Sequence, residues 1–203
     1  AWYATLMTSG EIEERFKFEL RNIDSPLQGH PDTNLCSWVD VSTGALAQGL
    51  SIALGRAQAK RLKKQDSYVY CIVGDGECQE GQVWEAIMYA GFRKVSNVVV
   101  FLDHNKTQGD GKLENIMSLN PIVEKFSSFN WQVQEINGHS HQAIRNSIRQ
   151  AKANTYKPSV IIADTRKGYW GPGKVLLDGA HSGMLSDADY ADAMAYIKGK
   201  GGK

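Results

Sequence analysis

Residues 68–77 read YVYCIVGDGE, a run of six apolar or aromatic residues that ends in a polar turn between glycines. A second run of the same form occupies 98–106, where VVVFL leads into DHNK. Short runs rich in β-branched and aromatic residues are typical of buried parallel strands. Because α/β sheets bind ligands beyond the carboxyl ends of such strands, we expect the polar residues after both runs to face a common site.

Two oxygen-bearing side chains, Asp75 and Asn105, follow these expected strands. Taken singly, each is an ordinary turn residue. Together at neighbouring strand ends they favour a hard cation such as Mg²⁺, which commonly takes phosphate oxygens as further ligands. Gly74 and Gly76 flank Asp75 and allow the backbone to approach a bulky anion. The pattern predicts a site for a metal ion and a diphosphate, with Asp75 in a loop that reaches solvent beyond the core.

The rest of the chain alternates helical and strand patterns, with further strands expected at 131–136 and 159–165. This alternation predicts an α/β fold in which helices cover both faces of a parallel sheet. Residues 84, 87, 88 and 90 are expected in the core. Ser42 or Thr43 is expected to cap the first long helix, so that Gly44-Ala45-Leu46 opens it. Helices are expected at 43–64, 82–93, 121–129, 141–153 and from about residue 187.

The bulk properties are those of an ordinary soluble protein. A chain of 203 residues is expected to form one domain over 1–198, followed by a flexible tail at 199–203. With 23 basic and 22 acidic side chains, nothing indicates binding to nucleic acid or to an anionic membrane. No apolar stretch approaches the roughly 20 residues that a membrane span needs. Cys36, Cys71 and Cys78 lack metal-ligand spacing and suit a reducing cytoplasm.

Several motifs together resemble a known family. Gly-Asp-Gly, followed by an asparagine 30 positions after the aspartate, resembles the thiamine-diphosphate motif. The blocks at 77–86 (ECQEGQVWEA), 29–31 (GHP), 42–51 (STGALAQGLS) and 180–183 (AHSG) narrow the resemblance to the transketolase group. The resemblance extends over about residues 3–196 and matches only the diphosphate-binding half of a transketolase. It implies the thiamine-diphosphate-binding fold of the diphosphate type.

The resemblance also implies roles for individual residues. The main-chain carbonyl of Thr107 would be a third metal ligand, with two diphosphate oxygens and a water completing an octahedron. His104 departs from the Asn or Asp that the family often has beside the ligand. His30 and His181 would border cofactor and substrate as catalytic residues, donating to phosphate or to a developing oxyanion; the alternative is a solvated loop histidine. The implied cofactor contacts are Gly44, Ala45, Leu46, Gly74, Asp75, Gly76, Glu77, Asn105 and His181.

The expected function follows from the resemblance and from what the chain lacks. The glutamate that activates the cofactor belongs, in the family, to a separate pyrimidine-binding domain, and the family's earlier Gly-His block is also missing here. We therefore expect either the amino-terminal subunit of a split transketolase or a fragment of a longer one. Such a subunit would bind thiamine diphosphate and Mg²⁺, with Ca²⁺ or Mn²⁺ as substitutes. With a pyrimidine-domain partner, it would form a heterotetramer.

The expected reaction is the transfer of a two-carbon ketol unit from a ketose to an aldose, with sugars or sugar phosphates as substrates. The expected location is the cytoplasm. Glu80 would lie at the interface with the partner, although it is also a favourable carboxylate for a helix start. Two alternatives remain open. One is a subunit of a related thiamine-diphosphate enzyme, of the deoxyxylulose-phosphate-synthase or dehydrogenase type, and the other is a non-catalytic scaffold.

Overall fold

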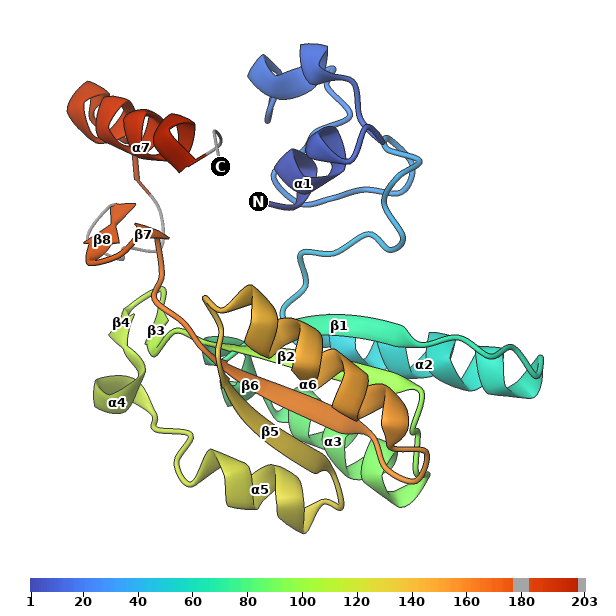
Figure 1. Ribbon diagram of the computed structural model, residues 1–203. Helices are drawn as coiled ribbons and strands as arrows, with labels where there is room; N and C mark the ends of the chain where they lie inside the picture. The colour runs from blue at the N-terminus through green and yellow to red at the C-terminus, as the bar shows by residue number, and fades with distance from the viewer. Residues whose placement is uncertain (177–182, 201–203) are drawn as a thin grey trace. The chain divides into compact units, whose positions relative to one another are not determined.

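The four expected strands form one parallel sheet with the order β1-β2-β6-β5 (Figure 1). The computed structural model describes residues 1–176 and 183–200. Each strand lies within two residues of its expected range, because the apolar runs that mark the strands are short and clearly bounded. The strands are β1 (Val69–Gly74), β2 (Val98–His104), β5 (Gln132–Asn137) and β6 (Ser159–Asp164).

The central strands β2 and β6 form the middle of the core. Val98, Val99, Val160 and Ile161 have no measurable exposure. β1 lies at one edge of the sheet, and Ile72 on this strand remains 77% exposed. The core therefore lies along the two middle strands, and their carboxyl ends emerge from its most buried part.

Helices lie on both faces of the sheet, as predicted. Figure 1 shows α6 on the near face and α2 and α3 on the far face, while α6 contacts β5 and β6 and α5 contacts β5. Four of the five long helices lie close to their expected ranges, and α2 is the exception. The five helices are α2 (Gln48–Leu62), α3 (Gly81–Phe92), α5 (Ile122–Ser128), α6 (His141–Ala153) and α7 (Asp187–Lys200).

The start of α2 differs from the prediction. The helix begins at Gln48 rather than at residue 43, so Gly44-Ala45-Leu46 does not form its first turn. Gly44 has a φ of +145° and Ala47 a φ of +72°, and neither value is compatible with a right-handed helix. The expected cap at Ser42 or Thr43 is therefore wrong.

One expectation about apolar residues also changes. Met88 on α3 is 55% exposed, so it is not a core residue. Ile87 and Ala90 are fully buried as expected, and Trp84 is half-buried. The exposure of Met88 shows that the apolar stripe of α3 is wider than its buried face.

Short elements occur in segments that the sequence patterns left irregular. The segment from 103 to 120 contains an antiparallel hairpin and a helical turn, and a second hairpin lies within 166–185. These elements are α1 (Trp2–Thr8), η1 (Glu14–Phe18), η2 (Gly76–Gln79), β3 (Thr107–Gln108), β4 (Gly111–Lys112), α4 (Leu113–Ile116), β7 (Tyr169–Gly171) and β8 (Lys174–Val175).

Internal contacts divide the chain into two compact units, Ala1–Gln48 and Gly49–Lys203. The prediction of one domain over 1–198 stays a prediction. Residues 199 and 200 of the expected tail belong to α7, and 201–203 lie outside the described residues. No helix within the described residues is both long and apolar enough to cross a membrane.

Candidate cofactor and metal site

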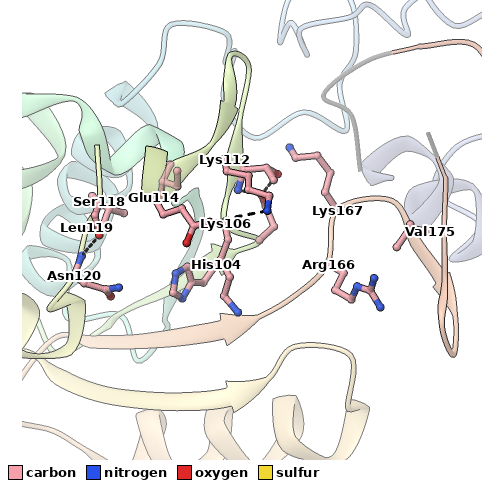
Figure 2. Close-up of a pocket in the computed structure, with 13 residues that line it drawn as sticks. His104, Lys106, Lys112, Glu114, Ser118, Leu119, Asn120, Arg166, Lys167 and Val175 are labelled. Carbon is pink, nitrogen blue, oxygen red and sulfur yellow. Dashed lines mark hydrogen bonds and ion pairs between the residues drawn. The ribbon is translucent and has the colours of Figure 1, made fainter. Parts of the chain in front are cut away.

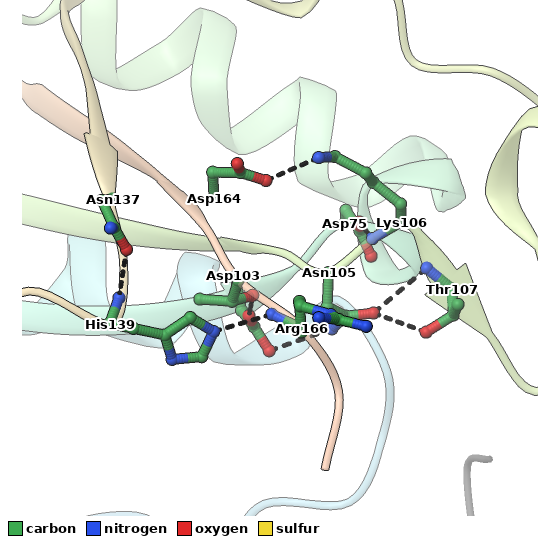
Figure 3. A network of polar contacts seen from close by, with 10 residues as sticks. Asp75, Asp103, Asn105, Lys106, Thr107, Asn137, His139, Asp164 and Arg166 are labelled. Atoms are coloured by element: carbon green, nitrogen blue, oxygen red, sulfur yellow. Dashed lines mark hydrogen bonds and ion pairs between the residues drawn. The ribbon is translucent and has the colours of Figure 1, made fainter. Parts of the chain in front are cut away.

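Asp75 follows β1 directly and forms the N-cap of η2. Two main-chain N–H groups from different loops donate to its carboxylate. Figure 3 shows Asp75 beside Lys106. The N–H of Gly76 donates to Oδ1 at 2.8 Å, and the N–H of Lys106 donates to Oδ2 at 2.5 Å. Asp75 is only 1% exposed, so the expectation that it reaches solvent is wrong. The loop after β2 folds over the carboxylate and covers it.

The electrostatics of Asp75 fit a nearby cation. Burial raises the pKa of the Asp75 carboxyl, and the N–H groups of Lys106 and Gly76 oppose this rise. No side-chain cation forms an ion pair with Asp75 in the part of the chain that the structure describes. A buried carboxylate is costly unless it is paired or coordinates a metal. Asp75 is therefore a suitable metal ligand.

Asn105 lies on the neighbouring loop, after β2. Its Oδ1 accepts from the N–H of Thr107 at 3.1 Å and from the Thr107 hydroxyl at 2.8 Å, while its Nδ2 donates to Asp103 Oδ2 at 3.0 Å. These bonds fix the orientation of the amide and identify its oxygen. A metal bound here would compete with the Thr107 hydroxyl for Asn105 Oδ1, and that hydroxyl is free to rotate away.

The described residues contain no cluster of three or more His, Cys, Asp or Glu side chains that could hold a metal. An all-protein cage is thus absent from them. One carboxylate, one amide oxygen and one main-chain carbonyl form a sparse set of oxygen ligands, which is the kind that Mg²⁺ uses with substrate phosphates. The residues present fit a metal–diphosphate group.

The sheet register explains why the two loops meet. Gly74 at the end of β1 pairs with Asp103 on β2, and the N–H of Asp75 donates to the Asp103 carbonyl at 3.2 Å. The Asp103 side chain is in turn held by the Thr165 hydroxyl after β6. Three strand ends are therefore linked through Asp103, which the sequence pattern did not single out.

The two glycines beside Asp75 are not equivalent. A Cβ atom on Gly76 would lie 2.6 Å from Gln108 Cβ, which is closer than side chains normally approach. A Cβ on Gly74 would meet nothing closer than 3.9 Å, in contact with Glu77. The Glu77 carboxylate accepts from the N–H of Gly74 at 3.1 Å and so closes the turn. Only Gly76 is needed here for a close approach.

The predicted residues of the amino-terminal unit form their own contact. His30 is exposed, and a Cβ on Gly44 would lie 2.9 Å from its Cγ, so the bare glycine backbone packs against the imidazole. Ala45 and Leu46 are exposed beside Gly44. His181 lies outside the described residues. The structure thus places Asp75, Asn105 and Thr107 together in the larger unit, and His30 with Gly44 in the smaller one.

A pocket of about 460 Å³ lies in the larger unit beside the loop after β2 (Figure 2). This loop, residues 105–107, carries two of the expected metal ligands and is called the metal loop below. One side consists of residues 104–107, 112–114 and 118–120, and the other side includes Arg166, Lys167 and Val175. Asn105 and Thr107 line this pocket. The metal loop therefore faces a space large enough for a phosphorylated ligand.

Comparison with known proteins decides the family. Residues 8–198 match the model of the transketolase, thiamine diphosphate binding domain. The chain belongs to this family. It is 35% identical to the 6-deoxy-6-sulfo-D-fructose transketolase subunit SqwG of Clostridium sp. (strain MSTE9), over 99% of the chain and 73% of that protein. It is 34% identical to a subunit of the apulose-4-phosphate transketolase of Phocaeicola vulgatus, over 97% of the chain and 70% of that protein.

Solved transketolases share the fold of this family member. The transketolase of Campylobacter jejuni superposes with a TM-score of 0.68 at 33% identity, over 72% of this chain and 24% of that chain. A transketolase mutant from Pichia stipitis gives a TM-score of 0.77 at 28% identity, over 88% of this chain and 28% of that chain. Two predictions are confirmed, namely the α/β transketolase fold and the role as one subunit of a transketolase-type enzyme.

Proposed function

We propose that this transketolase-family chain binds thiamine diphosphate through a divalent cation held by Asp75, Asn105 and the main-chain carbonyl of Thr107. The observation that carries the proposal is the buried Asp75 carboxylate, which has main-chain donors but no cationic side-chain partner in the described chain. The oxygen ligands favour Mg²⁺, and Ca²⁺ or Mn²⁺ would serve the same geometry. Gly74, Gly76 and Glu77 would shape the turn against the diphosphate.

The bound cofactor would act as the electron sink for carbon–carbon bond chemistry. The chain's own residues would bind and orient it. The Asp75 carboxylate and the Asn105 amide oxygen would fix the cation, and the cation would fix the diphosphate. His30 and His181 would donate a proton or hydrogen bond to phosphate oxygens or to an oxyanion that develops on the sugar. Gly44, Ala45 and Leu46 would contact the thiamine.

A second subunit with a pyrimidine-binding domain would supply the glutamate that activates the cofactor. Both similar relatives named above are themselves called subunits of transketolases. We propose a heterotetramer of two chains of each kind, built around a two-fold axis, with Glu80 at the interface. Glu80 is exposed at the start of α3, where it is available to a partner.

The proposed reaction moves a two-carbon ketol unit from a ketose to an aldose. The named relatives act on a sulfonated sugar and on a sugar phosphate, and anionic sugars of this kind are the proposed substrate class. The three cysteines, all free thiols, support a location in the reducing cytoplasm.

The direct test uses the chain with a candidate pyrimidine-domain subunit from the same genome. Purified chain, purified partner and the mixture are assayed for ketol transfer with thiamine diphosphate and Mg²⁺. We expect activity only in the mixture. Light scattering of the mixture should show a heterotetramer with two chains of each kind. Full activity of the chain alone would contradict the need for a partner. A complex that binds the cofactor but transfers no ketol unit would favour a related thiamine-diphosphate enzyme, and no cofactor binding would favour a scaffold.

A further inference from the structure

A second pocket of the larger unit is lined by residues of η2, α3, α5 and the segment 117–119. Its volume is about 420 Å³, which lies in the usual range of small-molecule sites. It shares only Ser118 and Leu119 with the pocket beside the metal loop. None of the described residues that line it is a proposed metal or cofactor ligand. The proposed function therefore leaves this pocket without a role.

The lining of this pocket is mostly apolar and aromatic. The rings of Trp84 and Phe129 have a centroid distance of 6.3 Å and are inclined at 41°. Cys78 and Leu119 are buried, whereas Met117 is 50% exposed, so the pocket has buried residues on one side and an exposed one on another. Aromatic rings prefer offset or tilted aromatic neighbours. A planar ring is therefore the kind of group that suits these walls.

Hydrogen bonds between the elements hold the walls of the pocket in place. The indole N–H of Trp84 on α3 donates to the Cys78 carbonyl of η2 at 2.8 Å. The Nε2 of Gln79 donates to the Met117 carbonyl at 2.8 Å and ties η2 to the segment 117–119. A ligand that enters a pocket with fixed walls loses little affinity to the ordering of side chains and loops.

Lys125 is the only charged side chain among the described residues that line this pocket. Its Nζ donates to the Leu119 carbonyl at 2.8 Å and lies 5.9 Å from the centroid of the Trp84 ring. It forms no ion pair with a carboxylate in the described part of the chain. An ammonium group has three donors, so two remain for a ligand. The Ser118 hydroxyl, which accepts from the N–H of Asn120 at 3.2 Å, can donate as well.

We propose that this pocket binds a small aromatic carboxylate, with its ring against Trp84 and Phe129 and its carboxylate on Lys125. Burial of the ring removes apolar surface from water, and the ammonium and carboxylate form charge-assisted hydrogen bonds. A phosphate monoester carries about two negative charges, which one lysine would not balance, whereas a carboxylate carries one. The bound molecule would contact Cys78 and Gln79 in the turn η2, but the inference does not depend on the proposed metal site.

The test titrates benzoate into the full chain and follows the methyl groups of the methionines by NMR. Met117 lines the pocket, so its methyl signal should move in a saturable way, with a dissociation constant in the millimolar range that is usual for so small a ligand. The methyl signal of Met194 on α7, which does not line the pocket, should stay in place. Benzyl alcohol has the same ring without the charge. It should bind about tenfold more weakly at low ionic strength.

A substitution at Lys125 tests the role of its charge. Lys125→Leu keeps an apolar stem and removes the ammonium group, so benzoate should bind about tenfold more weakly and no better than benzyl alcohol. The ratio of the two ligands is compared within each variant, so a general loosening of the pocket affects both alike. Lys63→Leu, at an exposed lysine just after α2, is the matched control and should keep the preference of the parent chain for benzoate.

Several results would overturn the inference. A Met117 methyl signal that does not respond to benzoate would show that the pocket is not a ligand site. Equal affinity of the parent chain for benzoate and benzyl alcohol would remove the role of the carboxylate, and this comparison stands even if Lys125→Leu fails to fold. A preference for benzoate that survives in Lys125→Leu would contradict the role of Lys125. Displacement of benzoate by a pyrimidine-domain subunit would assign the pocket to a contact between subunits instead.

Discussion

The main-chain N–H of Lys106 donates to the buried Oδ2 of Asp75 across the gap between two strand ends, at 2.5 Å. Lys106 adopts the left-handed conformation with a φ of +66°, and its side chain turns away to pair with Asp164. Lys106 therefore holds the Asp75 carboxylate through its backbone N–H rather than through its side-chain charge. This contact joins the loops after β1 and β2 into one structural unit.

Asp75→Asn is expected to abolish Mg²⁺-dependent binding of thiamine diphosphate. The amide keeps the size of the side chain and an acceptor for a main-chain donor, but it removes the negative charge that holds the cation. Asn105→Ala should act in the same direction but less strongly, because it removes a neutral ligand. Calorimetry with and without Mg²⁺ measures both effects. Asp110→Asn, at an exposed aspartate of the β3–β4 hairpin, is the control.

Asp75→Ala is a poorer test of the same site, because the fold itself depends on this carboxylate. The substitution leaves the N–H groups of Lys106 and Gly76 without acceptors, at a cost of about 1–3 kcal/mol for each buried group. Thermal melts should therefore show a lower Tm for Asp75→Ala than for Asp75→Asn. Equal melting temperatures would contradict the structural part of this argument.

Gly76→Ala is expected to destabilise the chain by about 1–3 kcal/mol, as overpacked sites commonly do. Its new methyl group would lie 2.6 Å from Gln108 Cβ and would displace the β3–β4 hairpin. Gly74→Ala is the matched control, since its methyl group would meet only ordinary contacts. Urea unfolding of the two variants measures the difference. Similar losses at both positions would show that the close approach at Gly76 is unimportant.

His30→Ala is expected to lower turnover of the complex by at least about tenfold, in the range typical of lost proton-transfer groups. The Tm should change little, because His30 is an exposed loop residue. His181→Ala should behave in the same way. His141→Ala, at the exposed start of α6, is the control for loss of an imidazole. A fall in Tm that parallels the fall in turnover would instead make His30 a packing residue for Gly44.

The Cys71 thiol is expected to react slowly with iodoacetamide at pH 8. Burial raises its pKa to about 11, and the nearby Glu77 carboxylate acts in the same direction. A thiol of pKa 9 has about 10% thiolate at pH 8, whereas one of pKa 11 has about 0.1%, so alkylation should be about 100-fold slower. The rate should keep rising up to about pH 11. Mass spectrometry of alkylated peptides over this range measures it, and a plateau near pH 9 would contradict the shift.

The sheet was predictable because its signal is local. Each strand is a short apolar run that ends in a polar turn, and the register then follows from parallel pairing at Gly74 and Asp103. The start of α2 was not predictable, because nothing in the local sequence indicates the positive φ angles that Gly44 and Ala47 adopt. The exposure of Met88 has the same origin, since an apolar residue at helical spacing does not reveal which neighbour covers it.

The candidate site was predictable in its ligands but not in its environment. Asp75 and Asn105 stand directly in the motif, whereas the burial of Asp75 depends on the loop that folds over it from β2. Arg166 and Lys167 carried no signal in the sequence, because a basic pair after a strand is usually a solvated turn. Only the sheet order, which places β6 beside β2, brings that pair to the pocket of the metal loop.

The position of β6 between β2 and β5 also bears on how the chain folds. β1 and β2 are consecutive strands in the sequence and can pair early. Residues 105–158 separate β2 from β6, so a long loop must close before β6 pairs with β2. Closing so long a loop costs conformational entropy and slows folding. During synthesis the loops after β1 and β2 would therefore form first. Arg166 and Lys167 would complete the lining of the pocket only after β6 has emerged from the ribosome.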